Sequence, residues 1–516
     1  METEVLIVGA GPSGLVLALW LAKLGIRIRI IDRAPQSGMA SRAFALQART
    51  LEFYDQVGLA RDAIARGRVI TGMNVHIGGR SVEPVPFGEF GRGLSPFPFV
   101  LVLLQDDHEK LLIDHLAAAG IQVERNTELI DLDDRGGVVR ARLKGLGGGD
   151  DFCEAAFVCG CDGVSSIVRE LSKIGFPGES SNELFFVADV EATGSSVDGE
   201  LHYVMSGDDI CSVFPLRGDG RVRLIGLVPE LARKTLLQID FDDVSWQLRQ
   251  DADLEVSLVE SFSTYRVQQR IATEWRKGRV FLLGDASHVH SPAGGQGLNA
   301  GVGDAVNLAW KLAAVLRDGA DAALLDTYQS ERIEAARRIA ATTDRGFALQ
   351  AKRGKLMRWA RSALTGLAPR LMRMSLFRRW AFRTISQLAI DYRKSGASAG
   401  KAGRVAGGDR LPWVGRTDQS DNFTSLRGIG WQAQVFGQVD GQLRDACAKW
   451  GLALHGFAWT PAARRAGFAK DAVYLVRPDG YVAYASTSQD PLAIRQQLLR
   501  FKISFAAGQA EGRSAA

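Results

Sequence analysis

The residues best suited to chemistry near the start of the chain are a set of closely spaced glycines. Gly9-Ala10-Gly11-Pro12-Ser13-Gly14 follows the apolar run 5–8 and opens the apolar stretch 15–24. Glycines at this spacing permit a tight turn, close approach of the backbone to a pyrophosphate, and close packing of a helix on a strand. The start of the following helix also attracts phosphate charge. The motif therefore predicts a dinucleotide site, without separating FAD from NAD, at Gly9, Gly11, Pro12, Ser13 and Gly14.

A carboxylate follows the glycine motif at a useful distance. Asp32 stands at the end of the next predicted strand, 26–31, and Arg33 comes directly after it. A carboxylate at the end of the second strand of such a unit can accept hydrogen bonds from ribose hydroxyls. We therefore expect Asp32 and Arg33 to lie against the nucleotide.

A second glycine-rich stretch lies far along the chain, between the apolar run 280–283 and a helix predicted over about 301–316. Asp285 can bind a ribose or ribityl hydroxyl. Backbone N–H groups at the start of the helix stabilise an anion, and a reduced flavin is such an anion. The stretch predicts that the dinucleotide contains a flavin, held by Gly284, Asp285, Pro292, Gly295, Gln296, Gly297, Leu298 and Asn299.

These motifs need a parallel sheet to bring them together. Residues 5–31 read as strand, helix and strand, which is the start of such a sheet. Helices are predicted over 40–60 and 106–120, and strand-rich segments over 67–104, 121–160 and 184–228. A long basic helical stretch covers 345–393 and a Gly/Ser linker 394–408. The tail has a compact α/β pattern, with strands at 473–476 and 481–484 joined by Arg477-Pro478-Asp479-Gly480.

Composition narrows the class of protein. The 516 residues are enough for two or three domains, with 46% hydrophobic and 23% charged residues. A net charge of +5 permits an anionic cofactor but gives no basis for nucleic-acid binding. The five cysteines suit a reducing cytoplasm, and no run is long enough to span a membrane. No metal site is predicted.

The motifs, taken in order, resemble those of the single-component FAD-dependent aromatic hydroxylases, the class A flavoprotein monooxygenases. The middle motif is Cys161-Asp162-Gly163 with Ser166 and Arg169, and the third runs from Gly284-Asp285 to Asp304, Asn307, Trp310 and Lys311. In the family, the middle motif is associated with both FAD and the nicotinamide cofactor. By the same resemblance, further FAD contacts are expected from Arg42 and Gln105, and cofactor contacts from Asp162, Gly163 and Arg169.

The resemblance implies an α/β fold: an FAD-binding Rossmann-like domain of the glutathione-reductase type with an inserted β-rich substrate domain. Residues 1–175 and 270–345 would form the FAD-binding domain, with part of the β layer at about 67–104, and 176–269 the substrate domain. A helical connector would cover 346–400. The tail, 401–516, resembles the thioredoxin-like C-terminal domain of the phenol hydroxylase and polyketide hydroxylase branch. Because Cys447 is its only cysteine, we expect this domain to be redox-inactive.

The resemblance also implies the reaction. FAD, reduced by NADPH or alternatively NADH, would react with O₂ to give a C4a-hydroperoxide that hydroxylates a phenolic or polycyclic, polyketide-like aromatic substrate. Pro292 would lie beside the reacting carbon, and His202 and Tyr203 would line the substrate roof. The proton acceptor is not identified, because His288 reads as a cofactor-loop residue and His290 equally as a structural one.

Other functions stay open at this stage. The same flavin chemistry supports epoxidation, Baeyer–Villiger oxidation and inactivation of aromatic drugs. The basic segment 345–393 could lie on anionic lipid, although arginines covering the protein body are the favoured interpretation. A non-catalytic flavin-binding protein is a further alternative, and a homodimer is neither predicted nor excluded.

Overall fold

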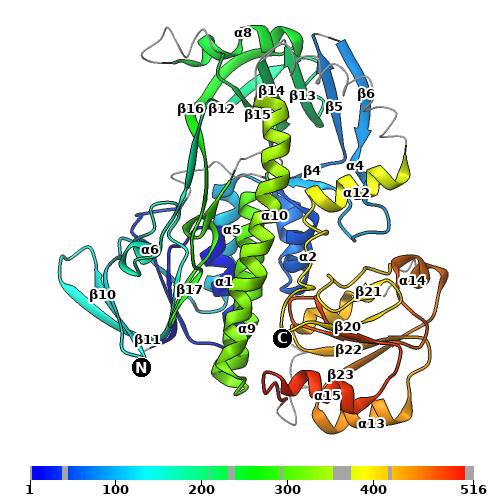
Figure 1. The fold of residues 1–516 in the computed structure, drawn as a ribbon. Helices are drawn as coiled ribbons and strands as arrows, with labels where there is room; N and C mark the ends of the chain where they lie inside the picture. Colours follow the sequence, from blue (N-terminus) through cyan, green and yellow to red (C-terminus); the bar gives the residue numbers. More distant parts are fainter. Residues whose placement is uncertain are drawn as a thin grey trace.

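The computed structural model describes residues 3–37, 45–78, 80–206, 209–229, 239–290, 295–351, 374–415 and 421–505. Figure 1 shows a sheet-containing body at the N-terminus, a large second sheet above it, and a C-terminal body. The long helices α9 (Gly297–Arg317) and α10 (Asp326–Ala351) run between them. The predicted α/β fold class is confirmed.

The first sheet brings all three motifs to one edge. Its central strands lie in the order β18 (Val280–Leu282), β11 (Asp150–Gly160), β1 (Thr3–Val8) and β2 (Ile28–Ile31), all paired in parallel. The carboxyl ends of parallel strands lie at the same edge, where open α/β sheets bind ligands. The motifs at Gly9, Cys161 and Gly284 follow β1, β11 and β18 at that edge. The sheet is completed by β8 (Val123–Glu124), β9 (Glu128–Asp134), β10 (Val139–Lys144) and β17 (Arg276–Lys277).

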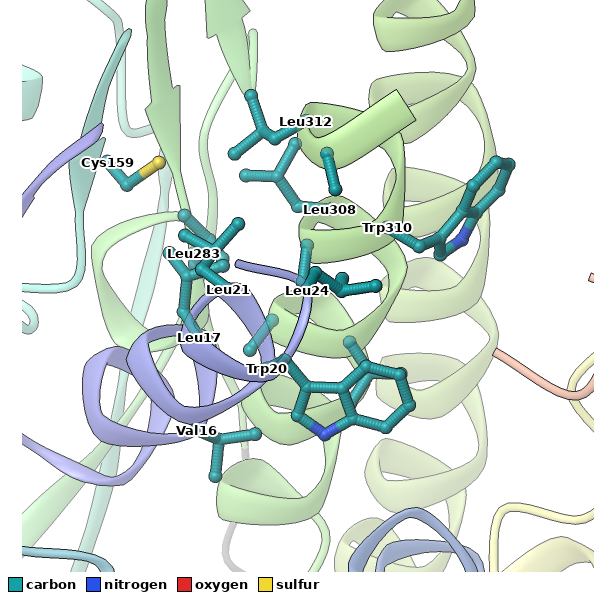
Figure 2. Close-up of a cluster of buried hydrophobic side chains, with 14 of the residues drawn as sticks. Val16, Leu17, Trp20, Leu21, Leu24, Cys159, Leu283, Leu308, Trp310 and Leu312 are labelled. Atoms are coloured by element: carbon teal, nitrogen blue, oxygen red, sulfur yellow. The ribbon is translucent and has the colours of Figure 1, made fainter. Parts of the chain in front are cut away.

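Helix α1 (Pro12–Lys23) is buried between this sheet and α9. Its residues from Gly14 to Leu21 are all buried. Because it is apolar around its whole circumference, it needs neighbours on both sides. Figure 2 shows Leu17 and Leu21 of α1 close to Leu308 of α9. The packing of α1 on α9 fixes the two glycine turns relative to each other.

The second sheet has eight strands in the order β19-β16-β12-β15-β14-β13-β5-β6. Helix α8 (Phe241–Asp251) covers one face, where its Phe241 and Val244 pack on Val204, Val213 and Leu224. The strands are β5 (Gly72–Ile77), β6 (Arg80–Pro86), β12 (Gly178–Thr193), β13 (Leu201–Ser206), β14 (Asp209–Pro215), β15 (Arg221–Leu227), β16 (Glu255–Ile271) and β19 (His288–Val289).

Short elements connect the two sheets. A small three-stranded sheet consists of β3 (Ala45–Leu46), β7 (Val100–Val102) and β4 (Arg68–Ile70). The connecting helices are α2 (Ala48–Gln56), α3 (Ala60–Arg66), α4 (Phe87–Gly91), α5 (Gln105–Ala118) and α6 (Ile167–Leu171).

The basic segment 345–393 falls partly outside the described residues, which omit 352–373. Its described helix α12 (Ser375–Ile385) packs on α4 through Phe382. Arg378 pairs with Glu89 at 3.0 Å, and Arg379 donates to the carbonyl oxygen of Arg92 at 3.3 Å. In α12 these two arginines therefore contact the protein body, as the favoured interpretation expects. Among the described residues, no helix is both long and apolar enough to cross a bilayer.

The C-terminal body is a six-stranded sheet in the order β21-β20-β25-β24-β22-β23. The predicted hairpin is present, since β24 (Val473–Val476) and β25 (Val482–Ser486) pair antiparallel. Cys447 is buried and its burial raises the thiol pKa to about 11, which suits a structural cysteine. The other elements are β20 (Ala399–Ala402), β21 (Val405–Ala406), β22 (Gln432–Phe436), β23 (Ala453–Phe457), α13 (Gly441–Trp450), α14 (Pro461–Ala466) and α15 (Pro491–Leu499).

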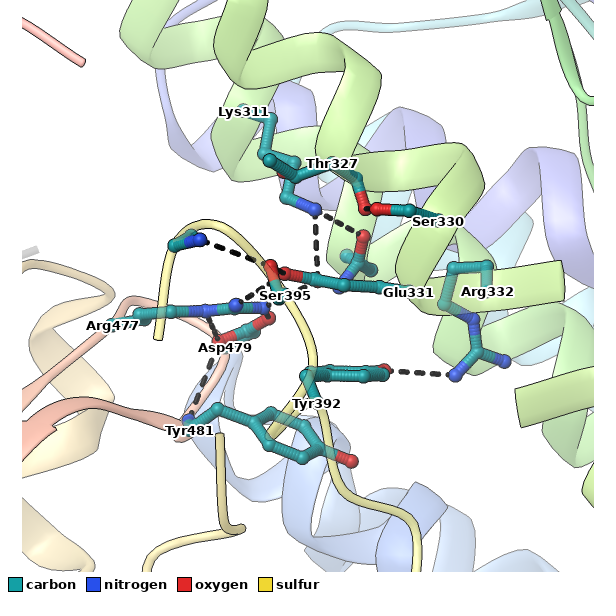
Figure 3. Close-up of polar contacts among 12 residues, drawn as sticks. Lys311, Thr327, Ser330, Glu331, Arg332, Tyr392, Ser395, Arg477, Asp479 and Tyr481 are labelled. Atoms are coloured by element: carbon teal, nitrogen blue, oxygen red, sulfur yellow. Dashed lines mark hydrogen bonds and ion pairs between the residues drawn. The ribbon is translucent and has the colours of Figure 1, made fainter. Parts of the chain in front are cut away.

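A buried ionic network joins this body to α9 and α10 (Figure 3). Arg477 donates to both carboxylate oxygens of Glu331, at 2.8 and 3.1 Å, and also pairs with Asp479. Lys311 donates to Glu331 at 2.9 Å. These four side chains are at most 1% exposed. Buried charges need excellent geometry to repay their desolvation, so the network fixes one docked arrangement of the C-terminal body.

Acid is expected to weaken this docking. Burial alone would raise the pKa of Glu331, but Arg477 and Lys311 outweigh it and hold that pKa well below its usual value. The unfolded chain therefore takes up this proton first, and stability falls as pH drops below about 4.5, by about 1.4 kcal/mol per pH unit for each proton. Urea unfolding between pH 6 and pH 3.5 measures the slope. Glu331→Gln should flatten it, whereas Glu334→Gln, in a surface ion pair of α10, should not.

Candidate active site

The first glycine turn combines tight packing with open space. A Cβ atom on Gly9, whose φ is +104°, would lie 2.4 Å from the carbonyl oxygen of Cys161. A Cβ atom on Gly14 would lie 2.0 Å from the carbonyl oxygen of Gly9. By contrast, a Cβ atom on Gly11 would have no described atom within 4 Å. Two glycines are thus required by the protein's own packing, and the third leaves the space that a pyrophosphate needs.

Asp32 holds the turn in shape. One of its carboxylate oxygens accepts from the backbone N–H of Ala10 at 2.6 Å, and the other from Ala34 at 2.7 Å. Arg125 lies 3.7 Å from the same carboxylate, and Arg33 is exposed beside it. A carboxylate has about four acceptor positions. Asp32 can therefore support the turn and still accept from a ribose hydroxyl.

The second glycine turn lies directly against the first. Cβ atoms built on Gly284 and Gly301 would lie 2.4 and 2.3 Å from Oγ of Ser13, the second residue of α1. The starts of α1 and α9 therefore approach each other with almost no side chain between them. Asp285 follows β18 and is exposed at the shared edge of the sheet. The predicted meeting of the two glycine turns is present.

Behind this contact lies a buried carboxylate. Asp304 of α9 accepts from the backbone N–H of Gly284 at 3.0 Å and from Nε of Arg332 at 2.7 Å. Nε2 of His288 lies 2.9 Å from the same carboxylate. Burial would raise the pKa of Asp304, but Arg332 and His288 outweigh it and lower it. Asp304 thus stays ionised and fixes the direction of the Gly284 turn.

His288 is part of that support. Besides its contact with Asp304, its ring stacks on Trp275 with centroids 5.0 Å apart, and it is 2% exposed. These contacts agree with the prediction of a loop residue more than with a base that reaches substrate. Pro292 and Arg42, both predicted cofactor contacts, lie outside the described residues.

The side chain of Asn299 is engaged within the protein. Its Oδ1 accepts from the backbone N–H of Gln47 at 2.8 Å and from Oγ1 of Thr50 at 2.7 Å. Its Nδ2 donates to the carbonyl oxygens of Ala45 and Gly295, at 2.8 and 2.7 Å. The side chain thus ties α9 to β3 and α2, so only its backbone could serve a cofactor. The carbonyl of Gln296 is likewise engaged, by Gln387 at 3.0 Å.

The middle motif joins the second turn through Arg169. Asp162 accepts from Oγ of Ser166 at 2.5 Å and from the N–H of Val168 at 3.1 Å, which shapes the start of α6. Arg169 then donates to the carbonyl oxygen of Ala286 at 2.9 Å. Burial raises the pKa of Asp162. Gly163 takes φ of +78°, which favours glycine.

Gln105, at the start of α5, donates to Glu109 at 2.8 Å.

His202 and Tyr203 lie on opposite faces of the second sheet. Adjacent residues of a strand alternate between faces. His202 is on the face that α8 covers, 2% exposed, bonded to Asp198 at 2.8 Å and to His76 at 2.9 Å. Tyr203 is on the other face, with Met205 and Ile225. The two candidates therefore cannot line one pocket.

The face of the second sheet that carries Tyr203 continues as an apolar layer toward the edge of the first sheet where the glycine turns lie. Leu201, Phe214 and Leu216 of the second sheet pack with Ala45 and Val102 of the small sheet. Ala45 also borders the second glycine turn, because a Cβ atom built on Gly295 would lie 3.1 Å from the Cβ atom of Ala45. This layer places aromatic and aliphatic side chains beside the turn.

The sequence interpretation gave no role to several residues that support the site. Asp304 stood out only as part of the family pattern, and Arg332 was given no role. Tyr392, which accepts from Arg332 at 2.9 Å, was not singled out. A signal was present for Arg332, because a charged pair, Glu331-Arg332, follows the helix start at residue 326.

Comparisons with known proteins agree with this geometry. An FAD binding domain model matches residues 2–343, and an aromatic-ring hydroxylase C-terminal model matches residues 406–502. A flavin-dependent monooxygenase of Mycobacteroides abscessus is 32% identical over 503 residues, covering 94% of this chain and 97% of that protein. The 6-methylpretetramide 4-monooxygenase of Streptomyces rimosus is 38% identical over 360 residues, covering 68% of this chain and 62% of that enzyme.

A solved structure matches almost the whole chain. The anhydrotetracycline hydroxylase OxyS from Streptomyces rimosus superposes with a TM-score of 0.77 at 28% identity, covering 98% of this chain and all of that one. The likeness includes the C-terminal body as well as both sheets. The chain therefore belongs to the family of FAD-dependent aromatic-ring monooxygenases.

Proposed function

We propose that this chain hydroxylates a polycyclic phenol, with FAD as resident cofactor, NADPH as hydride donor and O₂ as oxidant. The observation that carries the proposal is the juxtaposition of two glycine turns with an apolar, aromatic-bearing layer at one edge of a parallel sheet. Two relatives named above act, by their names, on 6-methylpretetramide and on anhydrotetracycline. The five cysteines are buried and form no disulfide with one another, which suits a reducing compartment such as the cytoplasm.

The residues present fit FAD. The space beside Gly11 and the start of α1 would hold the pyrophosphate, and Asp32 the ribose. Asp285 would bind a ribityl hydroxyl, and the N–H groups of Gly295 to Leu298 would face the flavin ring. FAD supplies the redox chemistry when bound: it accepts hydride and delivers oxygen to the substrate. Asp162 and Arg169, joined to the second turn, are proposed to serve the nicotinamide.

The protein's own contribution is to orient, to exclude water and to hold charge. The helix start at Gly297 would stabilise negative charge on a bound, reduced flavin. The apolar layer of Leu201, Phe214 and Leu216 keeps water from the substrate face. A phenolic ring stacked against this layer would present one edge to the second turn.

A screen of phenolic compounds tests the proposal. Purified holoenzyme is mixed with NADPH and each compound, and NADPH oxidation, peroxide formation and product mass are followed. The proposal expects a multi-ring phenol to stimulate oxidation and to gain the mass of one oxygen atom. Stimulated oxidation that yields peroxide alone with every compound, or a ring-expanded or epoxide product, would overturn hydroxylation.

The two faces of β13 give a sharper test. Tyr203→Ala should raise KM for the phenol about tenfold, because it removes an aromatic contact on the cofactor side of the sheet. His202→Gln, on the face that α8 covers, should change KM less than about twofold. Steady-state kinetics with a substrate from the screen measures both. Equal effects would contradict the assignment of the pocket to the Tyr203 face.

A further inference from the structure

Tyr392 lies beyond residue 343, where the match to the FAD binding domain ends, yet its side chain bonds to a residue that supports the second glycine turn. It belongs to the segment that links α12 to the C-terminal sheet. Its hydroxyl accepts from Nη1 of Arg332 at 2.9 Å, and its ring lies 4.3 Å from that of Tyr481 in the C-terminal body. Tyr392 is 4% exposed and Arg332 is 2% exposed. The contact is thus a buried link between two parts of the chain.

Arg332 carries this link forward to the second glycine turn. Its Nε donates to Asp304, and its Nη2 donates to the carbonyl oxygen of Ala300 at 2.9 Å. The other oxygen of Asp304 accepts the N–H of Gly284. The N–H of Gly284 is therefore only three hydrogen bonds from the hydroxyl of Tyr392. Gly284 has φ of +57°, and the adjacent Asp285 depends on that turn for its direction.

Glu331, the residue before Arg332 in α10, also connects this helix to the C-terminal body. Glu331 is held by Arg477 of the C-terminal hairpin, while Arg332 is held by Tyr392 (Figure 3). Arg477 also lies over the ring of Tyr392, 5.2 Å from its centroid. One turn of α10 is thus clamped by the C-terminal body at the point where it supports Asp304.

We propose that Tyr392 is a positioning residue for FAD, acting through Arg332 and Asp304 on the Gly284-Asp285 turn. The C-terminal body is then part of the cofactor site's scaffold, because its Tyr481 and Arg477 contact Tyr392. The inference rests on the assignment, made under the proposed function, of this turn to FAD. Removing the hydroxyl leaves a buried guanidinium N–H without its acceptor, so Arg332 and Asp304 shift and the turn loosens.

A pair of matched substitutions tests the proposal. Tyr392→Phe removes the relay hydroxyl. Tyr474→Phe removes another buried hydroxyl of the C-terminal region, one whose hydrogen-bond partners are Ala469 and Ala402 and not members of the relay. FAD affinity of the apo-proteins is measured by fluorescence titration, with visible circular dichroism of the bound flavin and melting temperature. Tyr392→Phe should raise the FAD dissociation constant about three- to tenfold and alter the flavin dichroism.

Tyr474→Phe should lower the melting temperature about as much as Tyr392→Phe does, but it should leave FAD affinity within about twofold of wild type. Unchanged affinity in Tyr392→Phe, or an equal loss in Tyr474→Phe, would overturn the proposal. In an Arg332→Gln background, Tyr392→Phe should weaken FAD binding no further, and additive losses would also count against the relay. If that background does not fold, the two tyrosine variants decide the matter. The titration needs no substrate, so it can be read even if the proposed hydroxylation fails.

Discussion

Gly11→Val is expected to abolish FAD binding while leaving the apo-protein as stable as wild type. The backbone of Gly11 has φ of −78° and ψ of −179°, which valine adopts without strain. No described atom of the chain would lie within 4 Å of its Cβ atom, so the folded protein has room for the new side chain. That room is where the pyrophosphate would lie. We expect FAD affinity to fall at least about a hundredfold, measured by titration of the apo-protein, with a melting temperature within about 2 °C.

Gly14→Ala is the matched control, because it adds a smaller group in the same turn. Its Cβ atom would lie 2.0 Å from the carbonyl oxygen of Gly9, so the backbone must move. The variant should lose about 1–3 kcal/mol of stability even without cofactor. A Gly11→Val protein that binds FAD normally would show that the pyrophosphate lies elsewhere. One that melts early would show that the space is not open.

The position of the three motifs at one edge of the sheet could be predicted from the sequence, because it depends on local patterns. Each motif comes directly after a short apolar run, and parallel strands bring the turns at their carboxyl ends to one edge. One turn requires both signals: Gly9 and Gly14 have no room for a side chain, and Asp32 accepts from the backbone N–H of Ala10. Their meeting with Gly284 is then a consequence of strand pairing. The strands of the second sheet were also anticipated as a β-rich layer.

The contacts that could not be predicted depend on partners far apart in the chain. We expected the backbone N–H of Asn299 to serve the cofactor, but not that its side chain accepts from Gln47 and Thr50 at the start of α2. Nothing local in the sequence shows that pairing. His202 and Tyr203 are a different case. Strand alternation already implied that only one of two adjacent residues could face a pocket, and that signal was present but not applied.

Glu331→Ala is expected to lower the free energy of unfolding by about 3–5 kcal/mol, one of the larger effects open to a single substitution. Glu331 accepts from Arg477, Lys311, Asn307 and Ser395, and it is fully buried. Removing it leaves two buried cations with less negative charge between them. Lys311 can respond by losing its proton, since burial has already lowered its pKa to about 8. Arg477 cannot, and it keeps only Asp479. Urea unfolding at pH 7 measures the loss.

The double variant Lys311→Met/Glu331→Gln tests whether uncompensated buried charge causes the loss. It removes one cation and one anion together and leaves the Arg477–Asp479 pair balanced. If uncompensated charge is the cause, this variant should be more stable than Glu331→Ala by about 1–3 kcal/mol, although it carries two changes. Methionine and glutamine keep nearly the volume of the pair they replace, so a double variant less stable than Glu331→Ala would mean that the specific bonds of Lys311 and Glu331, more than uncompensated charge, hold the C-terminal body in place.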